Sequence, residues 1–140
     1  MIAVHFFFEV EVPHNTTKNA PHTEILPLSY GVITDVFFHL PRGSVGLLGF
    51  NLLYHDHQMY PANPGGWYRG NETTILFGEY QPITVNPYEL KARAYNFDDT
   101  FDHSFFVGLA MQRPEEMGRE IPAVSLAALQ DLIGTEIPED

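Results

Sequence analysis

Apolar and polar side chains alternate with a period of two along much of this chain, and that pattern constrains the fold most. In "FFFEVEV", every second residue from Phe6 is apolar, and Phe7, Glu9 and Glu11 lie between them. In "YELKARAYN", the charged residues Lys91 and Arg93 alternate with small or apolar ones. This period belongs to a β-strand with one buried face. It occurs in four stretches, 6–12, 31–41, 88–96 and 104–112.

Turn-forming segments separate these stretches, such as "PRGS" (41–44), "PANPGG" (61–66) and "NFDDTFDH" (96–103). Less regular strands are predicted at 24–30, 45–54, 57–60, 73–79 and 82–85. Many short strands with closely spaced turns favour an all-β fold, and no helical pattern precedes residue 120. We therefore predict an antiparallel β-sandwich over residues 1–112, of jelly-roll or immunoglobulin-like type.

The C-terminal part has a different pattern. Residues 113–122, "RPEEMGREIP", predict a polar linker, and "AVSLAALQDLIG" (123–134) predicts a short amphipathic helix. Its apolar side chains are Leu126, Leu129, Leu132 and Ile133. A helix of about three turns is marginal in water, so it must dock on its own domain or on a neighbouring subunit. We take residues 113–140 as an arm and these four side chains as partner contacts.

Composition excludes several classes of protein. The chain has 140 residues and no cysteine, so disulfides, thiolate metal sites and cysteine nucleophiles are excluded. Its 7 basic and 18 acidic residues give a net charge of −11, which opposes nucleic-acid binding. No stretch is long and apolar enough for a membrane span. The start of the sequence lacks the features of a signal peptide, so no export is expected.

The stretch "YHDHQMYP" (54–61) raises the question of a metal site. His55 and His57 have the spacing that lets two imidazoles on one strand share a metal. From Gly49 onward, G-x5-H-x-H resembles the start of the cupin metal motif, which implies a metalloenzyme. The Glu that continues this motif is replaced here by Pro61 and Ala62. The polar residues also fit the tip of a hairpin, and we predict the hairpin and no metal.

The single tryptophan follows the turn "YPANPGG" and precedes Tyr68. Three interpretations of Trp67 stay open at this point. With Tyr60 and Tyr68 it could stack on a sugar ring, as in glycan-binding modules. With Tyr68 it could anchor a protein interface. Alternatively, it covers the core. We take Trp67 and Tyr68 as partner contacts, with a glycan as the alternative ligand.

Three carboxylates, Asp98, Asp99 and Asp102, precede His103. They could bind Ca²⁺, but the stretch lacks the Gly and distal Glu of an EF-hand, and Asp residues are common in turns for backbone reasons. No nucleophile elbow and no phosphate-binding glycine loop occurs. We predict that the protein is not an enzyme and needs no cofactor.

Four segments, "NTTKNAP", "LSYGVITDVFFHLPRGSVGLLGF", "YPANPGGW" and "YNFDDTFDHSF", together resemble small β-sandwich accessory or decoration proteins of tailed bacteriophage virions. The resemblance extends over residues 5–113. It implies a structural protein that forms homo-oligomers, such as trimers, and binds a major capsid protein or another virion protein. It also implies a location in the virion, after assembly in the host cytoplasm.

Overall fold

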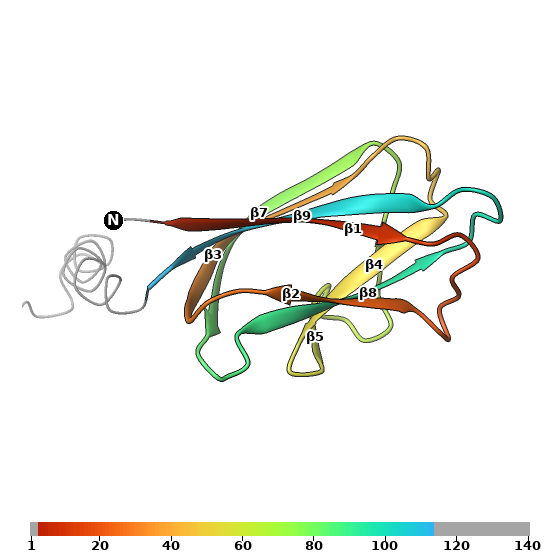
Figure 1. Cartoon of the computed structure of the whole chain (residues 1–140). Coiled ribbons are helices and arrows are strands. Elements are labelled where there is room, and N and C mark those ends of the chain that lie inside the picture. The colour runs from red at the N-terminus through yellow and green to blue at the C-terminus, as the bar shows by residue number, and fades with distance from the viewer. Residues whose placement is uncertain (1–2, 114–140) are drawn as a thin grey trace, which may run out of the picture.

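The computed structural model describes residues 3–113, which form two antiparallel β-sheets packed face to face (Figure 1). The strands are β1 (Val4–Val12), β2 (His22–Pro27), β3 (Gly31–Leu40), β4 (Leu48–Tyr54), β5 (His57–Tyr60), β6 (Tyr68–Arg69), β7 (Thr73–Ile83), β8 (Glu89–Asn96) and β9 (His103–Gln112). This confirms the prediction of an all-β antiparallel sandwich. The helix predicted within 123–134 lies outside the described residues.

The strand order identifies the type of sandwich. One sheet has the order β1-β9-β3-β7 and the other β2-β8-β4-β5, with the two-residue β6 beside β4. Chain neighbours mostly lie in opposite sheets, and the exceptions are β4, β5 and β6, which follow one another in the same sheet. A four-stranded and a five-stranded layer connected in this way form a jelly roll rather than an immunoglobulin-like sandwich.

The pairings are nested around one hairpin. Tyr54 pairs with His57 in the β4–β5 hairpin. Moving outward, β3 pairs with β7, β2 with β8 and β1 with β9. The described chain thus resembles one long hairpin wound into a sandwich, with its tip at residues 55–56 and its ends in the β1–β9 pair.

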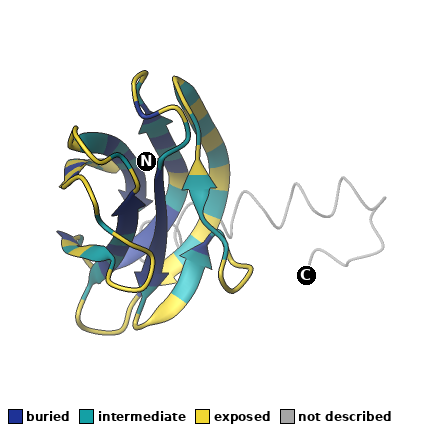
Figure 2. Ribbon diagram, turned by 90° about the vertical axis from the view of Figure 1, so that its right-hand side faces the viewer, coloured by how far each residue is buried: buried dark blue, intermediate teal, exposed yellow. Residues whose placement is uncertain are grey.

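The core lies between the sheets and is built from the inward sides of the alternating strands (Figure 2). Phe50 stacks on Phe105 with ring centroids 4.1 Å apart, and Phe38 meets Phe50 edge to face at 5.2 Å. Each such ring contributes about 1.5–3 kcal/mol when fully buried. In β1 the inner side chains are buried or half-buried, and Phe7, Glu9 and Glu11 are exposed, as the alternation predicts.

One strand prediction was wrong. The stretches 73–79 and 82–85 were expected to be separate strands. They form the single strand β7, which continues to Ile83. β7 is an edge strand, so a proline without an N–H group is tolerated there. Residues 3–113 contain no helix long and apolar enough to cross a membrane.

Candidate interaction surface

The outer surface of the β1-β9-β3-β7 sheet carries a row of apolar residues that come from all four strands. Phe7 pairs with Gly108, Gly108 with Phe37, and Phe37 with Leu76. Phe106 adjoins this row, with its ring stacked 5.7 Å from that of Phe7. We call Phe7, Phe37, Leu76 and Phe106, with Gly108 among them, the apolar face.

Two of these side chains are unusually exposed for their type. Phe7 retains 66% of its accessible surface and Leu76 72%. Gly108 leaves a gap between them, and a hollow of about 400 Å³ forms there, lined also by His5 and Asp35. Isolated exposed apolar residues are ordinary, but a contiguous patch with a hollow marks an interaction site.

Polar residues border the apolar face. In the next row of the sheet, Phe106 pairs with Glu9 on one side and with His39 on the other. The centroid of the His39 ring lies 6.2 Å from that of the Phe106 ring. The imidazole Nδ1 of His39 is 2.8 Å from the hydroxyl of Thr74. An apolar centre with a polar border is the usual anatomy of a protein interface.

Part of the outer surface of the other sheet is covered by the chain itself. Asn51, on β4, is completely buried, and its amide donates to the carbonyl of Gly66. Gln58 donates to the carbonyls of Pro61, Asn63 and Gly66. We call this surface of β4 and β8, beneath residues 61–67, the covered face.

Trp67 belongs to this cover. Its ring meets Tyr95 edge to face at 5.0 Å, and the Arg93 guanidinium lies 5.8 Å from its centroid. Tyr68 packs between Phe38 and Phe50, at 5.1 and 5.5 Å. These contacts agree with the interpretation of Trp67 as a cover, and its role in binding a partner stays a prediction.

The glycan platform is not brought together as expected. Tyr60 is only 4% exposed and its hydroxyl donates to Glu79 at 2.9 Å, pointing inward from β5. Burial, with the Glu79 hydrogen bond, strongly raises the pKa of Tyr60. Burial also raises the pKa of Tyr68, with a smaller contribution from Glu79. Neither side chain lies beside Trp67 as an open stacking surface.

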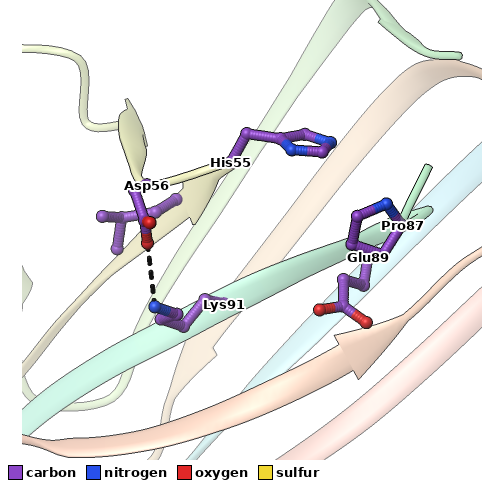
Figure 3. Close-up of a pocket in the computed structure, with 6 residues that line it drawn as sticks. His55, Asp56, Pro87, Glu89 and Lys91 are labelled. Carbon is purple, nitrogen blue, oxygen red and sulfur yellow. Dashed lines mark hydrogen bonds and ion pairs between the residues drawn. The ribbon is translucent and has the colours of Figure 1, made fainter. Parts of the chain in front are cut away.

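His55 and Asp56 form the two-residue turn of the β4–β5 hairpin, so the hairpin prediction is confirmed. Both have positive φ angles, 51° and 64°, as a type I′ turn requires. His55 Nε2 is 2.9 Å from the carbonyl oxygen of Val85. Figure 3 shows that Asp56 accepts from Lys91, at 2.9 Å. His55 is a turn residue, so His55 and His57 do not share one strand face.

A small hollow of about 210 Å³ lies beside this turn, lined also by Pro87 and Glu89. The Lys91 ammonium lowers the pKa of Asp56, first by its hydrogen bond and then by its charge. Within residues 3–113, no three His, Asp or Glu side chains are arranged to hold a metal ion.

The carboxylates of the 96–103 loop are engaged in local contacts. Asp98 accepts from the backbone N–H groups of Thr100 and Phe101, and its second oxygen is 2.8 Å from His103 Nε2. Asp102 contacts the backbone and the imidazole of His14. Hydrogen bonds from His103 and from His14 lower the pKa of Asp98 and of Asp102, respectively. These contacts account for both residues without a cation.

The sequence pattern alone does not predict the apolar face, although it contains part of the signal. The stretches "FFF", "VFFH" and "SFFV" each place a phenylalanine on both sides of a strand. Alternation indicates that Phe7 points outward, but it does not reveal that Phe37 and Phe106 become its neighbours. The predicted arm contacts Leu126, Leu129, Leu132 and Ile133 lie outside the described residues.

The fold defines the protein as a jelly roll, and similar folds are found in viral capsids. It is similar to a chain of the structure "Cyanophage Pam1 capsid asymmetric unit", with a TM-score of 0.53 and 14% identity over 80% of this chain and 85% of that chain. At this identity, the likeness concerns the fold alone.

A second solved structure, FeII HppE, matches with a TM-score of 0.37 and 7% identity over 76% of this chain and 43% of that chain, and supports no argument. No family model and no curated protein matches the sequence.

Proposed function

We propose that this protein is a non-enzymatic structural component of a virion, a capsid decoration or accessory protein or another head or tail component. It acts through contacts with copies of itself and with a major capsid or other virion protein. The observation that carries the proposal is the apolar face. A jelly-roll body that leaves four large side chains together on one sheet, three of them around a hollow, presents a surface suited to another protein.

The fold supports the same conclusion, since a chain of the Pam1 capsid asymmetric unit shares it. The predicted partner contacts Trp67, Tyr68 and the arm residues stay part of the proposal, beside the apolar face. In an assembly, the face would form the desolvated centre of a contact and its polar border would form the rim.

Particle association tests the proposal. Mass spectrometry of virus particles purified from the source of this sequence should detect the chain in an amount comparable to the capsid protein. Its absence from intact particles would contradict the virion role.

The apolar face is tested with charge variants. Phe7→Asp combined with Leu76→Asp should weaken association with particles at least about tenfold, because exposed aromatic and aliphatic anchors dominate such contacts. Val45→Asp is the matched control, since Val45 is 67% exposed but lies in the loop after β3, away from the face. Equal losses for both variants would exclude the apolar face as the contact.

A further inference from the structure

We propose that in the isolated protein the C-terminal segment 123–134 docks on the apolar face of its own chain. Docking brings Leu126, Leu129, Leu132 and Ile133 against Phe7, Phe37, Leu76 and Phe106. This inference rests on the proposed function, because it takes the apolar face as the contact surface. A virion partner would reach the face by displacing this segment.

The size of the apolar face suits a small occupant. Its exposed apolar area is on the order of 350 Å², whereas a standard interface buries about 800 Å² per partner. A single helix that carries one apolar stripe matches the smaller value. Residues 123–134, when helical, span about 18 Å, close to the width of about 14 Å across four strands.

The route from the sandwich to the face is short. β9 ends at Gln112 and carries Gly108, which borders the hollow. At about 3.4 Å per residue, Gly108 lies about 14 Å from that end. The nine residues 114–122 can span roughly 30 Å when extended. They are long enough to reverse direction and place the following segment on the sheet that β9 belongs to.

The short tether favours the segment's own chain over a second copy. A link of nine residues gives a local concentration in the millimolar range, far above that of another copy in dilute solution. The chemistry is complementary as well, because the four segment side chains are aliphatic and the lining of the hollow is mostly apolar, with Asp35 as its acidic residue.

Engineered disulfides test the proposal directly, because the natural chain has no cysteine. Leu76→Cys with Leu129→Cys should form an intramolecular disulfide about tenfold faster than Ile25→Cys with Leu129→Cys. Ile25 is the matched control. It is 46% exposed, but it lies on the other sheet, opposite Lys91. Equal rates would overturn the proposal. A disulfide that forms mainly between two chains would also overturn it, since the segment would then be exchanged between copies.

A charge variant provides a second measurement that needs no exact disulfide geometry. Leu129→Glu with Leu132→Glu should uncover the face and increase binding of a hydrophobic dye several-fold. Ala127→Glu with Gln130→Glu adds the same charge outside the apolar stripe and should leave dye binding near the natural level. Equal dye binding by the two variants would overturn the proposal. Particle association of the Phe7 and Leu76 variants is measured separately, so failure of the docking leaves the proposed function standing.

Discussion

The outer surfaces of the two sheets differ in how far the rest of the chain covers them. On the covered face, a hydrogen-bonded layer holds residues 61–67, including Trp67, against β4. It is formed by Asn51, Gln58 and Arg93. On the apolar face, Phe7 and Leu76 extend into solvent. We therefore expect the covered face to contribute more to stability than the apolar face does.

Gly49 lies on the covered face and Gly108 on the apolar face, and substitution of Gly49 should have the largest effect on stability. A Cβ atom at Gly49 would lie 2.4 Å from Cε2 of Tyr95, a buried ring that packs against Trp67. Gly49→Ala should therefore lower the free energy of unfolding by about 3 kcal/mol through overpacking. Urea denaturation measures this loss, and a change below about 0.5 kcal/mol would show that the covered face can adapt.

Removal of a buried hydrogen-bonding group should have the next largest effect. Asn51→Ala removes one donor to the carbonyl of Gly66 and one of the two acceptors of Arg93, and should cost about 2 kcal/mol. Thr74→Ala on the other sheet is the control, because Thr74 is exposed and should change stability by less than about 0.5 kcal/mol. If both variants lose the same stability, the contrast between the faces fails.

The second glycine should respond differently from Gly49. A Cβ atom at Gly108 would lie 3.3 Å from Cδ2 of Phe37 and 3.6 Å from Cδ1 of Phe7, and both rings border solvent and can shift. Gly108→Ala should therefore change the free energy of unfolding by less than about 1 kcal/mol. It also narrows the hollow, so association with particles should weaken by about tenfold. Unchanged association would mean that the hollow is not part of the contact.

The smallest effect is expected at the hairpin tip. Asp56 has a pKa below its ordinary value of 3.8 because of Lys91, so this pair stabilises the fold above pH 3.8 and loses its effect as the pH falls further. Lys91→Met should raise the pKa of Asp56 toward 3.8 in an NMR titration. Lys18→Met is the control and should leave that pKa unchanged, since Lys18 lies over Tyr95 instead.

Local patterns in the sequence predict the strands and their inward sides, because alternation depends only on neighbouring residues. Val10 and Phe105 are buried and Glu9 is exposed, as predicted. The turn at His55 and Asp56 was also predictable, since it interrupts an apolar run. Strand order was not predictable, because a jelly roll and an immunoglobulin-like sandwich share the same alternation.

The apolar face was not predictable either, because it depends on the strand order. Phe7 is recognisable as an outward phenylalanine, but its neighbours Phe37 and Leu76 are set by pairings between distant strands. The predictions at Trp67 and Tyr68 rested on residue type alone. A tryptophan after a Gly-rich turn has the same sequence pattern whether it covers its own domain or meets another protein.

The nested pairing has a consequence for biosynthesis. Phe7 lies in the first strand and Phe106 in the last, so the apolar face is complete only after β9 has joined β1. A nascent or truncated chain without β9 lacks Phe106 and Gly108, so it cannot present the complete apolar face. Under the function proposed above, only a chain that has completed the sandwich would present the whole contact surface to a virion partner.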